Sequence, residues 1–124
     1  MQTIGEINFT IFEKEFGRLK TNEVVLTSER ENHIKAHHAE DYYLFKLYSQ
    51  EIISTPDIVL RDEKNIGTVL MVKKLTDTNL NAVIRLALES DADKRINSIM
   101  TFYRIRERNL TKLISKNKVI YIRE

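Results

Sequence analysis

The chain has 124 residues, 42% of them hydrophobic and 31% charged, with a formal net charge of +2, which predicts one compact soluble domain over residues 1–124. It contains no cysteine, three glycines and one proline, and this excludes disulfide frameworks, thiolate metal sites and extended low-complexity segments. Because no apolar run approaches the roughly 18–20 residues of a membrane-spanning helix and the first residues lack the pattern of a signal peptide, we expect a cytoplasmic protein without membrane contact.

The first part of the chain gives a weak pattern followed by a clear strand. Residues 1–20 mix apolar and charged positions without a clean period, so this N-terminal extension could hold a strand around residues 7–12 or a short helix. Residues 20–27 end in an apolar run and are predicted to form a strand.

A helix is predicted directly after this strand. Ser28, with Glu31 three residues later, has the pattern of a capping box at a helix start. The segment 39–41 could divide the helix into two pieces, and Pro56 ends it. One side of the helix carries apolar residues at nearly helical spacing.

Short strands dominate the chain after Pro56. The predicted strands are 57–60, 67–74, 82–88, 96–104 and 119–122, and within 82–88 Ile84, Leu86 and Leu88 occupy alternate positions. Residues 105–115 suit a short helix. We predict an α+β fold in which the N-terminal helix packs on a mostly antiparallel, four-stranded sheet.

The net charge conceals an asymmetry along the chain. Residues 94–124 contain nine Lys or Arg residues against two Glu, a net charge of +7, so the preceding 93 residues carry −5. A basic segment of this kind favours polyanions such as nucleic acid, although a solvated basic face has the same composition.

All three histidines lie within six residues at the start of the predicted helix. Arg30, His33 and His37 are spaced i, i+3 and i+7, so their side chains share one helix face. Imidazoles transfer protons near neutral pH, and a guanidinium near a helix N-terminus binds phosphate. Together these residues could bind and protonate a phosphate ester, and Thr101 and Tyr103 share the face of a later strand that could complete the site.

Plainer interpretations fit the same residues. A histidine face on a surface helix can be simply solvated. His33 and His37 also have the i, i+4 spacing of half a zinc site, but Ile34 rather than Glu follows His33 and no third ligand has metal-site spacing. We therefore predict no metal and no cofactor, and we place His38 at the core edge or surface, about a quarter-turn from His37.

Across residues 22–122 the chain resembles the phage-associated barnase/EndoU/colicin/RelE-like nucleases. The most specific part is the segment Glu29-Arg30-x-x-His33-Ile34-x-x-x-His37 joined to the later Thr101-x-Tyr103 strand; Pro56-Asp57 adds a weaker element. The resemblance implies a helix against a four-stranded antiparallel sheet. It also implies metal-independent cleavage of RNA through a 2′,3′-cyclic phosphate, in a phage, prophage or other mobile element where such domains act as toxins or effectors.

The resemblance also implies roles for individual residues. His33 is the leading acid/base, Arg30 the phosphate clamp, His37 a second acid/base or orienting group, and Thr101 a hydrogen-bond donor to the phosphoryl oxygens. The candidate substrate-binding residues are Tyr103, which could stack on a base, and the basic residues Arg104, Lys74 and Arg85.

The predicted nuclease is expected to bind an RNA substrate and could also bind an inhibitor or antitoxin-like protein. Two further hypotheses come from other functional classes. The alternative is a module that binds RNA or protein on the same fold without cleaving it. A phage structural protein whose basic segment contacts packaged nucleic acid is a third hypothesis.

Overall fold

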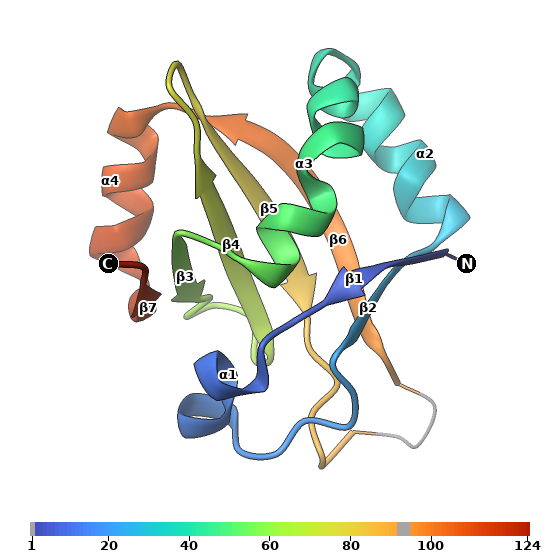
Figure 1. Ribbon diagram of the computed structural model, residues 1–124, viewed down its shortest axis with the longest axis vertical. Coiled ribbons are helices and arrows are strands. Elements are labelled where there is room, and N and C mark those ends of the chain that lie inside the picture. Colours follow the sequence, from blue (N-terminus) through green and yellow to red (C-terminus); the bar gives the residue numbers. More distant parts are fainter. Residues whose placement is uncertain (1, 92–94) are drawn as a thin grey trace.

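A seven-stranded mixed sheet forms the centre of the computed structural model, which describes residues 2–91 and 95–124 (Figure 1). Four α-helices and one 3₁₀ turn surround it in the described residues. In chain order the elements are β1 (Gln2–Glu6), α1 (Phe9–Phe16), β2 (Glu23–Leu26), α2 (Ser28–His37), η1 (Ala39–Asp41), α3 (Tyr42–Ser54), β3 (Ile58–Arg61), β4 (Thr68–Lys74), β5 (Asn79–Arg85), β6 (Asn97–Ile105), α4 (Glu107–Lys116) and β7 (Lys118–Ile122).

The strand order is β1-β2-β6-β5-β4-β3-β7. Strands β3 to β6 form the antiparallel meander that the sequence predicts. The prediction of a four-stranded sheet with one N-terminal helix is wrong, because β7 pairs with β3 at one side and β2 pairs with β6 at the other. The pairing of β2 with β6 is parallel, and β1 then adds antiparallel to β2.

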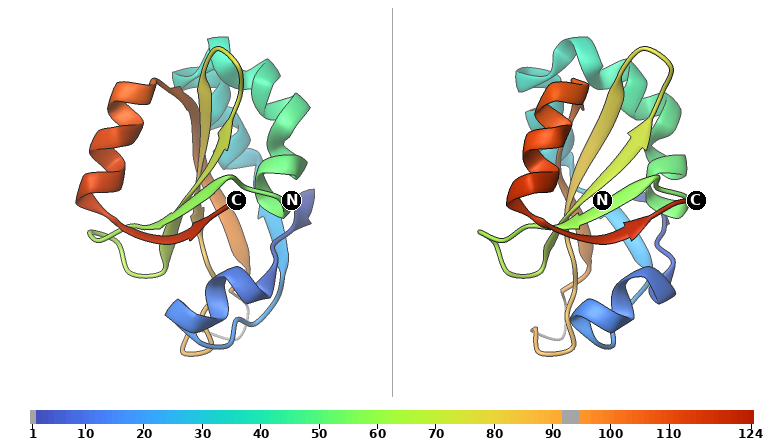
Figure 2. Two further views of the ribbon diagram at one scale, coloured as in Figure 1. Left: turned by 60° about the vertical axis from the view of Figure 1, so that its left-hand side comes forward. Right: turned by 90° about the vertical axis from the view of Figure 1, so that its left-hand side faces the viewer.

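Alternating residues along the strands give the sheet two apolar faces. On β4, Val69 and Met71 belong to one core cluster and Leu70 and Val72 to another. Figure 2 shows α2 and α3 on one side of the sheet and α4 on the other. We call these sides the α3 face and the α4 face.

The α3 face carries the larger core. Helices α1, α2 and α3 contribute buried side chains to it, among them Phe12, Ile34, Phe45 and Ile52. The α4 face is covered less completely, because α4 packs on it through buried Leu110 and half-buried Leu113.

The helix boundaries correct the sequence-based predictions in part. The N-cap of α2 is Thr27, whose hydroxyl accepts a hydrogen bond from the Arg30 amide at 3.2 Å, so Ser28 is the first helical residue rather than the cap. The predicted division at residues 39–41 is confirmed as the turn η1, and α3 ends just before Pro56. No helix of the described chain is long and apolar enough to cross a membrane.

The N-terminal extension is an integral part of the sheet. Residues 2–6 form the edge strand β1, and of the two alternatives predicted for this segment the short helix is found from Phe9 onward, where α1 begins, rather than a strand around residues 7–12. The Asn8 side chain caps that helix by accepting from the Thr10 amide at 3.1 Å. An Asn cap followed by Phe12 turned into the core is a helix signal that a mixed pattern conceals.

Candidate functional site

Helix α2 occupies the edge of β6 that β2 leaves free. Strand β2 pairs with β6 only where Val24 and Val25 lie opposite Asn97 and Ser98. The chain then leaves the sheet and α2 contacts β6 beyond this pairing. The sequence therefore brings the helix that carries Arg30 alongside the half of β6 that carries Thr101 and Tyr103.

Four aromatic rings connect α2 with β6. The ring centroids of His33 and His37 lie 4.7 Å apart, and those of His33 and His38 lie 6.3 Å apart. The His38 ring lies 5.5 Å from the ring of Tyr103. We call these four residues the histidine–tyrosine cluster.

His38 belongs to this cluster although the sequence placed it at the core edge or surface. The reason is local, since His38 is the C-cap of α2 and has φ −136° and ψ 43°, outside the helical region. Its side chain therefore does not follow the helical period. The position of His38 could have been predicted from the helix end at residues 39–41 together with Tyr103 on the late strand.

The surroundings of His33 lower the pKa of its imidazole from the ordinary 6.5. Partial burial is the first cause, and the charges of His37, Arg30 and His38 add to it. A lowered pKa keeps His33 neutral near pH 7, the state in which an imidazole accepts a proton. Arg30, three residues before His33 on the same helix, is one of the charges that lower this pKa.

Below Tyr103, the α4 face contains a small buried polar group. The Asn81 amide donates a hydrogen bond to the Tyr103 hydroxyl at 2.9 Å, and Asn81 is fully buried. Asn81 Oδ1 and Thr101 Oγ1 are both buried without a partner among the described atoms. The Thr101 hydroxyl is thus enclosed, so its predicted contact with a phosphoryl oxygen needs a change in the side chains that cover it.

Arg104 lies on the opposite face of β6 from Tyr103. Its Nε donates to Asp41 Oδ1 at 2.5 Å and its amide donates to Asp41 Oδ2 at 3.1 Å. Glu40 lies 3.6 Å from another guanidinium nitrogen. Arg104 therefore fixes the turn η1 against the sheet, and this pairing raises the pKa of its guanidinium further.

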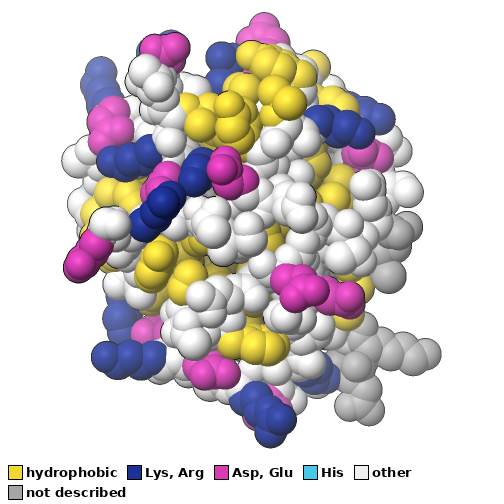
Figure 3. All heavy atoms as spheres, in the orientation of Figure 1, with side chains coloured by type: hydrophobic (Ala, Val, Ile, Leu, Met, Phe, Trp, Pro, Cys, Tyr) yellow, Lys and Arg dark blue, Asp and Glu magenta, His cyan; other side chains and the backbone are white. Residues whose placement is uncertain are grey.

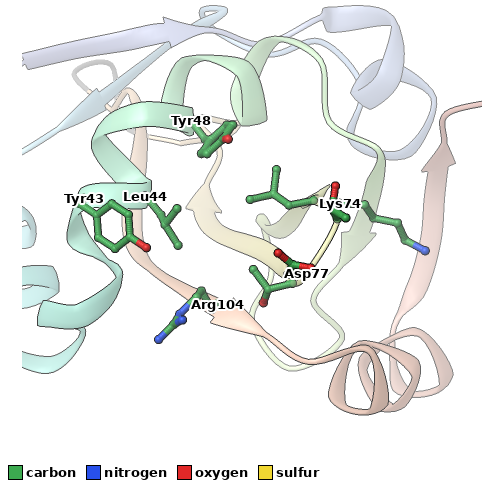
Figure 4. A pocket seen from close by; sticks show the side chains of 9 residues that line it. Tyr43, Leu44, Tyr48, Lys74, Asp77 and Arg104 are labelled. Atoms are coloured by element: carbon green, nitrogen blue, oxygen red, sulfur yellow. The ribbon is translucent and has the colours of Figure 1, made fainter.

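A groove of about 580 Å³ lies between α3 and the β4–β5 hairpin. Figure 4 shows Tyr43, Leu44 and Tyr48 along one wall and Asp77 on the hairpin opposite. The amino group of Lys74 is directed away from the tyrosines and lies 3.6 Å from Glu107. The predicted substrate residues Lys74 and Arg104 thus line this groove but are already paired with carboxylates.

Exposed apolar side chains continue from this groove over α3. Tyr43 is 60% exposed and Leu47, one helical turn later, is 70% exposed. Hydrophobic side chains gather over α3 in Figure 3, where no histidine is seen. The groove and the histidine–tyrosine cluster therefore face different sides of the molecule.

Arg85 lies at the other end of the sheet. It pairs with Ser98 in register, whereas Tyr103 pairs with Asn81 near the end of β6. The Arg85 guanidinium binds Asp91 Oδ1 at 3.1 Å and also donates to the Leu86 carbonyl. The positive charge of Arg85 is therefore paired within the fold, and Arg85 does not lie at the histidine–tyrosine cluster.

No protein-family model, curated protein or solved structure matches this chain. The functional argument therefore rests on the site itself. Two imidazoles in contact, a nearby guanidinium and a phenol can together exchange protons and hold an anion. No group of three or more side chains that could hold a metal ion occurs in the described residues.

Proposed function

We propose that this protein is a metal-independent endoribonuclease of a phage or another mobile element, acting as a toxin or effector. The single observation that carries the proposal is the contact between His33 and His37, with ring centroids 4.7 Å apart, where partial burial and then the neighbouring charges of His37 and Arg30 lower the pKa of His33. Such a pair can hold one neutral and one protonated imidazole, which is what acid–base cleavage of RNA requires.

The proposed reaction uses the 2′-hydroxyl of the RNA as nucleophile. Neutral His33 accepts the proton of that hydroxyl while its oxygen forms a bond to phosphorus. The bond from phosphorus to the 5′-oxygen breaks, and protonated His37 gives its proton to this leaving oxygen. Arg30 binds the phosphoryl oxygens as their negative charge increases. The products are a 2′,3′-cyclic phosphate and a 5′-hydroxyl.

Cleavage of RNA in excess EDTA tests the proposal. We expect the wild type to produce ends with a 2′,3′-cyclic phosphate and His33→Ala to cleave about 10²–10⁴-fold more slowly. Lys35→Ala is the matched control, because Lys35 is exposed on the same helix and lies over the Tyr42 ring rather than the histidines. Unchanged cleavage in His33→Ala would remove this residue from the mechanism.

The same assay separates the nuclease from a binding module. A folded wild-type protein that binds tRNA and mRNA with strong salt dependence but cleaves neither would support the non-catalytic hypothesis. A bell-shaped pH dependence of cleavage would support two titrating imidazoles.

A further inference from the structure

We infer that a cleft on the α4 face binds the nucleotide next to the cleaved phosphate of single-stranded RNA. This inference rests on the proposed ribonuclease function and assigns it a substrate subsite. The cleft has a volume of about 620 Å³, within the range of small-ligand sites. The residues that carry the argument are Lys64, Ile66, Val83, Arg95 and Met100.

The cleft continues the strip of sheet that leads to the histidine–tyrosine cluster. Val83 on its floor lies opposite Thr101, and Met100 directly precedes Thr101. Two residues further along β6, on the same face, Tyr103 contacts His38. A chain bound at the cluster and laid along β6 therefore enters the cleft.

The chemistry of the cleft fits a nucleotide. Ile66, Val83 and Met100 offer apolar surface to the face of a base, and Lys64 and Arg95 place cations at the rim for its phosphate. Neither cation forms an ion pair with a described residue, although the Arg95 charge contributes to a lowered pKa of Asp91. Because Lys64 and Arg95 form no ion pair with a described residue, they favour an anionic chain as occupant.

The other charged residues of the cleft, Asp62 and Arg85, bind groups within the fold. The carboxylate of Asp62 accepts hydrogen bonds from the Lys64 amide at 2.8 Å and from the Asn65 side chain at 3.0 Å. Arg85 is held by Asp91. Asp62 keeps its negative charge because its donors are neutral, so Lys64 and Arg95 against Asp62 leave the lining with a net charge of +1 beyond the Arg85–Asp91 pair.

The loop that forms one wall is ordered before any ligand binds. Besides the bonds to Asp62, the Thr68 amide donates to the Asn65 carbonyl at 3.1 Å, and the Glu63 amide donates to Asn117 at 3.0 Å. At the tip of this loop Ile66 is 81% exposed, the largest exposure of any large hydrophobic residue described. A fixed loop that presents an isoleucine to solvent reduces the entropy lost when a base packs on it.

The groove over α3 is the weaker candidate for RNA. Its cations, Lys74 and Arg104, are paired with Glu107 and Asp41. It also lies on the face of β6 opposite to Tyr103. An RNA chain held there would not continue along the strip that leads from the histidines.

Salt-dependent binding of a 2′-O-methyl oligonucleotide tests the inference, because RNA without a free 2′-hydroxyl binds without being cleaved by this route. We expect Lys64→Ala and Arg95→Ala each to reduce the slope of log K against log salt by about 0.7, the value for one phosphate contact in a single strand. Ile66→Ser should weaken binding at every salt concentration without changing the slope. Lys14→Ala removes the same charge from exposed Lys14 on α1, on the other side of the sheet, and should leave the slope unchanged.

The outcomes distinguish the subsite from the proposed function. If the wild type cleaves RNA but Lys64→Ala and Arg95→Ala bind like Lys14→Ala, the subsite is wrong and the ribonuclease proposal stands. If all three lysine and arginine variants lose the same slope, the attraction is general and the subsite is again wrong. If the wild type neither binds nor cleaves RNA, both proposals fall.

Discussion

The imidazole of His38 lies against the phenol ring of Tyr103, with ring centroids 5.5 Å apart. This contact joins the last turn of α2 to β6 at a point where no backbone pairing holds them together. It links the candidate proton-transfer residues to the buried Asn81 below the sheet surface, since Asn81 donates to the same tyrosine. The first prediction tests that link.

Tyr103→Phe should lower the free energy of unfolding by about 1–3 kcal/mol, because it leaves the amide of fully buried Asn81 without its hydrogen-bond partner. Urea denaturation measures the loss. Replacing both partners with apolar groups removes the unsatisfied amide, so Asn81→Leu combined with Tyr103→Phe should be more stable than the sum of the single changes predicts. If the destabilisation of the double variant equals the sum of the two single variants, the hydrogen bond contributes nothing to stability.

The pKa of His33 predicts how stability changes with pH. Its value in the folded state lies below the ordinary 6.5, so near that pH the unfolded chain binds more protons than the folded one. The free energy of unfolding should therefore rise with pH through this range, and the contribution of His33 should be lost as the pH falls through its lowered pKa. Denaturation by urea at several pH values from 5 to 8 measures this, with His33→Gln as the comparison. An identical pH dependence in the two proteins would contradict the prediction.

Thr27→Ala should destabilise the protein by about 0.5–2 kcal/mol, because the Thr27 hydroxyl accepts from the Arg30 amide at the start of α2. Ser28→Ala is the matched control, since Ser28 is exposed inside the first turn and should have little effect. Thermal or urea unfolding distinguishes the two. Equal effects would mean that the cap is not at Thr27.

Asn97→Ala should cost about 3 kcal/mol or more. The buried Asn97 side chain accepts from the Ala87 amide at 2.7 Å and donates to the Thr21 and Glu23 carbonyls at 2.8 Å each. Its loss leaves three backbone groups without partners where β2 meets β6. Asn109→Ala on the exposed side of α4 serves as the control in the same denaturation experiment, and a similar loss there would refute the role of Asn97.

Local patterns predicted the middle of the fold but not its flanks. The short apolar runs of β3 to β6 and the polar segments between them are properties of neighbouring residues, so the meander follows from them. The parallel pairing of Val24 with Asn97 joins distant segments and depends on the side chain of Asn97, which has no periodic signature. The predicted strand 82–88 misses the start of β5, where Asn79 and Asn81 are polar yet buried with side-chain partners.

The sequence also predicted one part of the candidate site and missed another. Helical spacing correctly placed His33 and His37 side by side. It could not place His38, whose backbone leaves the helix, nor reveal that the hydroxyl of Thr101 is enclosed. For Lys74, Arg85 and Arg104, sequence gives the charge but not the carboxylate that already binds it.

The parallel pairing of β2 with β6 has a consequence for the order of events during synthesis. Strand β2 and helix α2 are made early, but the strand that both contact is made late. Sheets built from such distant pairings fold over milliseconds to seconds rather than microseconds. Because His38 meets Tyr103 only once β6 has been made, the segment of β2 and α2 cannot form the histidine–tyrosine cluster on its own.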